Sequence, residues 1–232
     1  MRRENSGLEL SRVIFVGRTY DEYVKMFDLT DEELKNYTIL DTPAGACSFT
    51  AIASQLGYRV TAADIAYFHS VEQLYQKGLD DIEHAIEGIS KVKENYKWDY
   101  FNSIDELEKQ RNSALHNCVR HMKQFPELYS PANLPELPFN NGQFDMILSA
   151  HFLFMYSDRL DFNFHKKTLK EMTRVARKEI RIFPLADLSG SRYENLQEII
   201  MFIHDLGWKA EERIVSYEFQ QNGKSMLRVY KD

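Results

Sequence analysis

Residues 37–64 read YTILDTPAGACSFTAIASQLGYRVTAAD, and this stretch decides the fold. Residues 37–41 are rich in β-forming side chains and are followed by a turn that contains proline and glycine. A helical run covers residues 48–56 and stops at Gly57, a residue favoured just past a helix C-terminus. Residues 58–64 form a second extended run. A strand, turn, helix and strand within about 30 residues predict a βαβ unit and therefore a parallel sheet.

The rest of the chain continues the alternation of helices and strands. We expect helices over residues 20–35, 162–176 and 193–206, and strands over residues 128–132, 144–150 and 179–183. Residues 70–128 interrupt the alternation because they are charged, helical in pattern and nearly free of strand signals. Residues 208–219 and 224–230 are extended runs joined through Asn222-Gly223, which predicts an antiparallel hairpin. The predicted fold class is α/β, with a doubly wound, mostly parallel sheet, a helical insert after the second strand and a terminal hairpin.

The composition is that of an ordinary globular protein. The 232 residues, 44% of them hydrophobic and 28% charged, suit a single domain over residues 1–232, with N-terminal helices within residues 1–35. The net charge of −6 argues against binding of nucleic acid or an anionic membrane through bulk charge. Only two cysteines are present, which excludes a disulfide framework and a cysteine-rich zinc site.

Neither a membrane span nor a secretory signal is expected. The most apolar run, residues 146–156, is about half as long as a membrane span. The start of the sequence, MRREN, is too polar for a secretory signal. We therefore predict a soluble, cytoplasmic protein without a membrane or nucleic-acid partner.

The loop after the first predicted strand is the first candidate site. In doubly wound sheets nucleotide-like ligands bind at the carboxyl ends of the strands, and a helix N-terminus there offers free N–H groups. Asp41 at the end of the first strand could receive a cationic ammonium group. Asp64 ends the second strand. In nucleotide-binding folds, an acid about 20 residues after the loop that follows the first strand is the usual partner of a ribose diol. The alternatives are that Gly45 only makes a tight turn and that Asp64 only caps the next helix.

The glycine pattern narrows the class of ligand. A dinucleotide site requires G-x-G-x-x-G, and here Gly45 is the only glycine in the loop. The G-K-[ST] sequence of a phosphate-binding loop is also absent. The site therefore suits a ligand with one adenosine-like half and no pyrophosphate.

These features resemble the class I S-adenosylmethionine-dependent methyltransferases. Residues 41–50 resemble the first motif of that family, Asp64 its ribose-binding acid, and residues 133–145 (NLPELPFNNGQFD) its LPF and FD segment. The sequences D-x-P-A-G-x-x-S-F and S-x-H-x-L-F-x-Y-S-D (residues 149–158), with F-H and R-I-F-P-L further on, are similar to a bacterial branch of the family. The chain departs from the family where Pro43 and Cys47 replace glycines and Asn133 replaces an acid.

The resemblance implies a seven-stranded sheet and S-adenosylmethionine as the cofactor. The implied cofactor-binding residues are Asp41, Pro43, Gly45, Asp64, Ile65, Asn133 and Leu134. Asp41 would lie near the methionine amino group and Asp64 at the ribose hydroxyls, while Asn133 with its amide oxygen would accept from the adenine amine. The methyl group would lie near the end of the strand over residues 144–150.

His151 follows directly on that strand and is our first candidate for a catalytic base, with Tyr156 and then Asp158 after it. The alternative for His151 is a histidine at the edge of the core, bonded to the backbone. Asp161 and His165 are spaced to share a helix face, but without a third ligand we predict no metal. Cys47 begins a helix, which can lower a thiol pKa, although a bound cofactor would cover it.

Aromatic and histidine residues of the insert could form a substrate-specific lid, namely Trp98, Tyr100, Phe101, His116 and His121. The alternative is an extra layer of helices that only packs. Tyr20 and Tyr23 could close over the cofactor in the same way. Four phenylalanines near the catalytic candidates are expected in the core, namely Phe152, Phe154, Phe162 and Phe164.

The function predicted from the sequence is S-adenosylmethionine-dependent methyl transfer to a small or medium-sized acceptor molecule. The first alternative is a non-catalytic module that binds S-adenosylmethionine or S-adenosylhomocysteine. The second is a nicotinamide-dependent oxidoreductase, which the glycine pattern and the terminal hairpin oppose. The sequence identifies neither the acceptor nor the oligomeric state.

Overall fold

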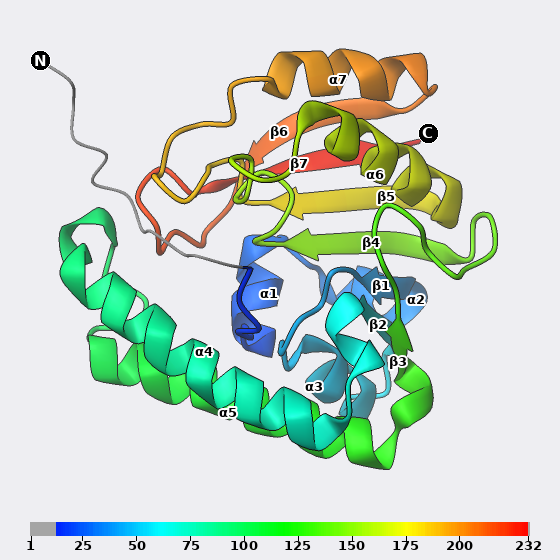
Figure 1. The fold of residues 1–232 in the computed structure, drawn as a ribbon. Helices are drawn as coiled ribbons and strands as arrows, with labels where there is room; N and C mark the ends of the chain where they lie inside the picture. Colours follow the sequence, from blue (N-terminus) through cyan, green and yellow to red (C-terminus); the bar gives the residue numbers. More distant parts are fainter. Residues whose placement is uncertain (1–12, 232) are drawn as a thin grey trace, which may run out of the picture.

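The computed structural model describes residues 13–231 and is built on a seven-stranded sheet with the order β3-β2-β1-β4-β5-β7-β6 (Figure 1). The strands are β1 (Thr38–Asp41), β2 (Arg59–Asp64), β3 (Tyr129–Pro131), β4 (Phe144–Ala150), β5 (Ala176–Phe183), β6 (Lys209–Ile214) and β7 (Ser225–Tyr230). Strands β1 to β5 are parallel, whereas β7 is antiparallel to both β5 and β6. The predicted fold class, with its terminal hairpin, is confirmed.

The helices lie where the periodicity predicts them. They are α1 (Tyr20–Met26), α2 (Asp31–Asn36), α3 (Phe49–Gln55), α4 (Val71–Lys91), α5 (Ile104–Gln124), α6 (Phe162–Val175) and α7 (Leu196–Asp205), with short 3₁₀ turns at Ile65–Phe68, Lys93–Asn95 and Pro126–Leu128. Residues 1–12 lie outside the described residues. They include the polar start of the chain and the first part of the predicted N-terminal region. In the described part of the chain, no helix combines the length and the apolarity that crossing a membrane requires.

Two apolar clusters cover the two faces of the sheet. Because side chains alternate along a strand, Ile39 packs in the cluster that includes α1 and α3, whereas Leu40 packs in the cluster that includes α6 and α7. The central strand β4 is buried at every position, as expected for a strand covered on both faces, and its apolar run Met146-Ile147-Leu148 lies between the buried polar residues Asp145 and Ser149. The FD segment has a structural role here, since the Asp145 carboxylate accepts hydrogen bonds from the Thr38 backbone N–H and hydroxyl, both at 3.0 Å.

The predicted helical insert is a pair of long antiparallel helices, α4 and α5, which lie side by side along one side of the molecule (Figure 1). Gly78 of α4 permits their close approach, because a Cβ atom there would lie 2.5 Å from Leu115 Cδ1 of α5. Helix α5 also contacts α3, which ties the insert to the βαβ unit. The insert therefore stands beside the carboxyl ends of the first strands.

Candidate functional site

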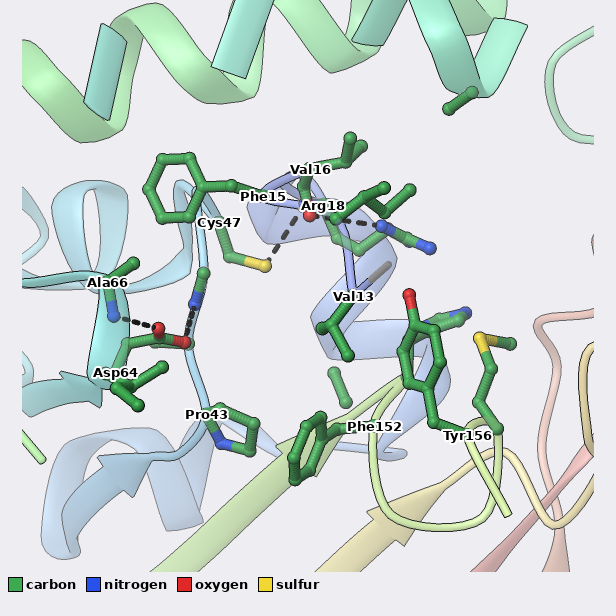
Figure 2. Close-up of a pocket in the computed structure, with 18 of the residues that line it drawn as sticks. Val13, Phe15, Val16, Arg18, Pro43, Cys47, Asp64, Ala66, Phe152 and Tyr156 are labelled. Atoms are coloured by element: carbon green, nitrogen blue, oxygen red, sulfur yellow. Dashed lines mark hydrogen bonds between the residues drawn. The ribbon is translucent and has the colours of Figure 1, made fainter. Parts of the chain in front are cut away.

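A cavity of about 570 Å³ opens at the carboxyl ends of β1, β2 and β4 (Figure 2). Its walls come from residues 13–18, from the loop after β1, from the residues that follow β2, β3 and β4, and from α4 and α5. This is the edge of a doubly wound sheet at which ligands bind, and the volume lies within the range of small-molecule sites.

Most of the predicted site residues line this one cavity. They are Pro43, Gly45, Asp64, Ile65, Asn133, Leu134, His151 and Tyr156. These eight come from four separate segments of the chain, which the parallel sheet brings to one edge. Asp41 is the predicted residue that the structure does not place in the lining.

Asp64 is held at the cavity wall by two backbone hydrogen bonds. Its Oδ2 accepts from the Gly45 N–H at 2.8 Å, and its Oδ1 accepts from the Ala66 N–H at 2.8 Å (Figure 2). The second bond caps the 3₁₀ turn, so the alternative role of Asp64 as a cap is realised as well. Each oxygen keeps a lone pair for a further donor. Burial raises the pKa of the Asp64 carboxyl, and the two N–H groups oppose that shift.

Gly45 is required by its backbone conformation. Its φ of +56° lies in the left-handed region, where a side chain would be strained, although a Cβ atom would meet only Val16 O at 3.8 Å. The carbonyl of Gly45 accepts a hydrogen bond from the Tyr67 hydroxyl at 2.8 Å. The turn before it contains a cis peptide bond between Thr42 and Pro43. The left-handed glycine aims its N–H at Asp64.

Asp41 is fully buried and lies outside the lining of the cavity. Its Oδ1 accepts a hydrogen bond from the Tyr23 hydroxyl at 3.0 Å, while its Oδ2 has no hydrogen-bond partner in the described part of the chain. Burial raises the pKa of the Asp41 carboxyl well above its ordinary value. The proposed contact between Asp41 and an ammonium group therefore stays a prediction.

Tyr20 and Tyr23 do not line the cavity either. Both rings stack on Phe49 of α3, with centroid distances of 5.7 and 4.8 Å. The structure places a different N-terminal segment over the loop.

The N-terminal segment, residues 13–18, crosses over the loop that follows β1 (Figure 2). The Arg18 N–H donates to Cys47 Sγ at 3.2 Å, and its carbonyl accepts from the Ser48 N–H at 2.9 Å. Gly17 makes this approach possible, because a Cβ atom there would lie 1.9 Å from the carbonyl oxygen of Ala46. Sequence reasoning missed this segment, which carries neither a periodic pattern nor a motif.

Asn133 and Leu134 line the cavity on the side of β3. Asn133 is exposed, and its backbone carbonyl accepts from the Glu136 N–H at 3.0 Å. Arg174 of α6 donates to the carbonyls of Leu137 and Phe139, at 3.1 and 2.8 Å. These bonds fix the segment that carries the two lining residues.

His151 lies at the end of β4 with a left-handed backbone, φ +52°. Its N–H donates to the Phe183 carbonyl at 2.6 Å, but its ring Nδ1 is buried without a hydrogen-bond partner among residues 13–231. Burial, with the nearby Arg18 and Arg111 charges, lowers the pKa of His151 well below its ordinary value. The backbone bond fits the alternative of a core-edge histidine, whereas the neutral ring keeps an unpartnered Nδ1 that can accept a hydrogen bond.

Tyr156 is buried, with its hydroxyl pointing into the cavity (Figure 2). Burial raises the pKa of the Tyr156 phenol, and a hydrogen bond with the Ile14 backbone opposes this. Asp158, the weaker candidate, is exposed, pairs with Arg159 at 3.1 Å and does not line the cavity. The two catalytic candidates that share the cavity are therefore His151 and Tyr156.

The insert forms one wall of the cavity, but through residues other than those predicted. The lining residues from this region are Lys77, Ala85, Ile86, Ile89, Tyr96, Leu107 and Arg111. The five predicted lid residues do not line it. Phe101 is buried in the core against Phe219, while Trp98 and Tyr100 are half-buried and pack against that core. A helical pattern shows which face is apolar and not what that face contacts.

Arg111 carries a buried ion pair across the cavity wall. Its guanidinium donates to both carboxylate oxygens of Glu22 in α1, at 2.6 and 2.9 Å, and the Tyr217 hydroxyl donates to the same carboxylate at 2.7 Å. Arg111 and nearby groups lower the pKa of Glu22 against the opposing effect of burial, so the carboxylate stays charged. This pair ties α5 to α1 and to the chain before β7.

The remaining candidates have other roles. Burial raises the pKa of the Cys47 thiol to about 12, which outweighs any effect of the helix N-terminus and leaves the thiol protonated at neutral pH. Asp161 caps α6 by accepting from the Phe164 N–H at 2.7 Å, and His165 Nδ1 lies 2.7 Å from the Tyr193 hydroxyl. Between residues 13 and 231 no cluster of three or more His, Cys, Asp and Glu side chains could hold a metal.

Two of the four phenylalanines expected in the core line the cavity instead. Phe152 and Phe164 are half-buried lining residues, whereas Phe154 is in the core, stacked on Tyr193 at 4.7 Å. The pattern of apolar residues in the sequence cannot distinguish side chains that pack in the core from side chains that line a cavity, because both sets are apolar.

Comparison with known proteins gives one relative at the level of sequence. No family model matches the chain. Over 225 residues it is 32% identical to the uncharacterized protein MJ0045 of Methanocaldococcus jannaschii, and the alignment covers 96% of this chain and 98% of that protein. The chain belongs to the family of MJ0045. The sequence resemblance pointed to a bacterial branch, whereas this relative is archaeal.

Solved structures show the class I S-adenosylmethionine-dependent methyltransferase fold. The mitomycin 7-O-methyltransferase MmcR is 11% identical with a TM-score of 0.51, over 92% of this chain and 54% of that one. The magnesium protoporphyrin IX methyltransferase of Synechocystis PCC 6803, with bound S-adenosylmethionine, is 12% identical with a TM-score of 0.49, over 92% and 78%. A methyltransferase of Aquifex aeolicus is 18% identical with a TM-score of 0.43, over 90% and 91%. At 11% identity, the likeness to MmcR concerns the fold alone.

Proposed function

We propose that this protein binds S-adenosylmethionine in the cavity and transfers its methyl group to a small or medium-sized acceptor molecule. The observation that carries the proposal is the Asp64 carboxylate at the end of β2. It is held by the N–H of Gly45, in the loop after β1, and it faces a cavity large enough for a nucleoside and a second molecule.

The residues of the cavity fit the parts of this cofactor. Asp64 offers acceptors to a ribose diol, and the Asn133 amide offers an acceptor to the adenine amine. The bound cofactor supplies a methyl group already activated on a sulfonium.

The chain's own part in the reaction is positioning and proton removal. His151 is neutral because burial and the neighbouring arginines disfavour its charged form, so its unpartnered Nδ1 can accept a hydrogen bond from the acceptor. The same environment makes the ring a weak base, so it takes the proton only as the methyl group transfers and the acceptor becomes more acidic. The Tyr156 hydroxyl lines the same space and can orient the acceptor by a hydrogen bond. Apolar walls, which include Phe152 and Phe164, exclude water from the nucleophile.

Isothermal titration with S-adenosylhomocysteine and S-adenosylmethionine tests the proposal. We expect one molecule bound per chain for both, and no heat with NAD under the same conditions. A folded sample that gives no heat with either sulfur compound would contradict the proposal, and heat with NAD alone would favour an oxidoreductase.

A non-catalytic binding module is a second candidate, favoured by the packing of the loop. Cys47 takes a glycine position of the methyltransferase pattern, and its sulfur is in contact with the Arg18 N–H of the N-terminal segment. Binding of S-adenosylhomocysteine, without conversion of S-adenosylmethionine in the presence of a broad set of acceptors, supports this candidate.

A further inference from the structure

The acceptor would bind at the end of the cavity that contains His151 and Tyr156, which we call the acceptor end. The balance of acidic and basic residues there is unusual. The lining there is largely apolar, with Phe152, Met155, Leu160, Phe164, Leu188 and Phe219. Among residues 13–231, Asp64 is the only acidic residue in the lining, and it lies at the other end, beside the loop after β1. The basic residues of the lining are therefore the groups that decide which ligand charge is accepted.

Two of these basic residues already have carboxylate partners. Arg111 is paired with Glu22 at 2.6 Å, and Lys77 with Asp81 at 2.5 Å. Their charges are neutralised from outside the cavity. Arg18, in contrast, has no carboxylate within ion-pair distance in the part of the chain that the structure describes.

Arg18 is half-buried, and its polar atoms are only partly satisfied. One terminal nitrogen donates to the Val16 carbonyl at 3.3 Å, a long bond, and its Nε is buried with no partner among residues 13–231. A buried guanidinium nitrogen without a partner costs free energy that an anionic ligand would recover. The planar guanidinium also matches a carboxylate through paired hydrogen bonds.

Arg18 lies at the acceptor end of the cavity. The Arg18 charge acts on the pKa values of His151 and Tyr156, and also on those of Glu22 and Cys47. Figure 2 shows the Arg18 side chain and the Tyr156 hydroxyl facing the same space. The backbone of Arg18 is fixed to Cys47 and Ser48, so the guanidinium is pre-positioned there.

We propose that the methyl acceptor is an organic anion with an apolar body, and that Arg18 binds its carboxylate beside His151. This inference rests on the proposed methyl transfer and adds the class of substrate. The carboxylate of the cofactor's methionine part is another group that an arginine would bind. The test distinguishes this carboxylate from that of the acceptor.

The test is isothermal titration with 2-naphthoate and with its neutral counterpart 2-naphthamide, on protein with and without saturating S-adenosylhomocysteine. We expect naphthoate to bind at least about tenfold more tightly than the amide. Arg18→Gln should abolish that preference, Arg18→Lys should keep part of it, and Arg120→Gln, an exposed arginine of α5, should leave it unchanged. Thermal melting of each variant verifies that it is folded. If Arg18→Gln does not fold, the preference measured for Arg18→Lys still tests the inference.

Affinity for S-adenosylhomocysteine and for 5′-methylthioadenosine, which lacks the amino-acid part, identifies the source of the carboxylate. We expect Arg18→Gln to change neither affinity. A loss for S-adenosylhomocysteine alone would assign Arg18 to the cofactor and overturn the inference, as would equal binding of naphthoate and naphthamide or no naphthoate binding at all. Because the titrations are also done without S-adenosylhomocysteine, failure of the cofactor to bind contradicts the proposed function and not the role of Arg18.

Discussion

Asp41 and Asp64 end neighbouring parallel strands, yet the structure treats the two carboxyl groups differently. Asp64 lines the cavity and accepts two backbone N–H groups. Asp41 is sealed from solvent behind the loop, with the Tyr23 hydroxyl on one oxygen and no partner among the described residues on the other. The comparison shows that a motif position predicts where an acid lies in the chain, whereas its packing decides whether it meets a ligand.

The largest effect is expected at Asp64. Asp64→Ala removes both the proposed ribose contact and the acceptor that holds the Gly45 N–H in place, so S-adenosylhomocysteine should bind at least about tenfold more weakly, a loss of roughly 1.4 kcal/mol. Isothermal titration measures the change. Asp158→Ala, an exposed acid outside the cavity, is the control, and an unchanged affinity in Asp64→Ala would remove this acid from the ligand site.

The next effect concerns the N-terminal segment, residues 13–18, which packs against Ala46, Cys47 and Ser48 of the loop after β1. Gly17→Ala places a Cβ atom 1.9 Å from the Ala46 carbonyl oxygen, so the backbone must move. We expect a loss of roughly 1–3 kcal/mol in the free energy of unfolding and weaker binding of S-adenosylhomocysteine. Gly142 has a positive φ of +60°, which Gly17 does not, and a Cβ atom there would meet nothing within 4 Å, so Gly142→Ala separates backbone strain from collision. Equal unfolding curves for wild type and Gly17→Ala would show that the segment is not packed as described.

Asp41 should behave in the opposite way to Asp64. Asp41→Asn keeps an acceptor for the Tyr23 hydroxyl, so the affinity for S-adenosylhomocysteine should change by less than about threefold. A loss as large as that of Asp64→Ala would instead show that Asp41 reaches the ammonium group, as the sequence predicts.

The stability of the same variant tests the environment of Asp41. Because the folded-state pKa of Asp41 is raised, its contribution to stability is fully present below the unfolded pKa of about 3.9 and is lost as pH rises through the folded value. The asparagine variant should therefore gain stability relative to wild type as pH rises above about 4. If the free energies of unfolding of wild type and Asp41→Asn differ by the same amount at all pH values, the result contradicts the burial of this carboxyl.

The smallest effect is a pH dependence at His151. Its folded-state pKa is lowered, so its contribution to stability is present above the unfolded pKa of about 6.5 and is lost as pH falls toward the folded value. His151→Asn, in which asparagine tolerates the left-handed backbone, should lose less stability than wild type between about pH 6.5 and 5. Urea denaturation at these two pH values measures the difference, and an identical loss would mean that the ring is not buried.

Local pattern predicted the sheet well and the site in part. The βαβ unit and the strand at β4 are visible in the sequence because turn residues and continuous apolar runs are local signals. Arg18 is not, since its role depends on the contacts of its backbone with Cys47, 29 residues later. The burial of Asp41 likewise depends on Tyr23, and the ion pair between Glu22 and Arg111 joins residues 89 positions apart. Such pairings are properties of the packed molecule.

The insert shows the same limit at the level of a whole element. Its pattern predicts helical structure, but the apolar positions do not reveal that Ile86 and Leu107 line a cavity while Phe101 packs in the core. Only the approach of α4 and α5, at Gly78 and Leu115, fixes which face turns to the site.

A crystal structure of the protein with S-adenosylhomocysteine tests the central claim most directly. We expect the nucleoside in the cavity at the ends of β1, β2 and β4, with a ribose hydroxyl within about 3.2 Å of an Asp64 carboxylate oxygen. A ligand that binds elsewhere, or in the cavity with its ribose turned away from Asp64, would contradict it.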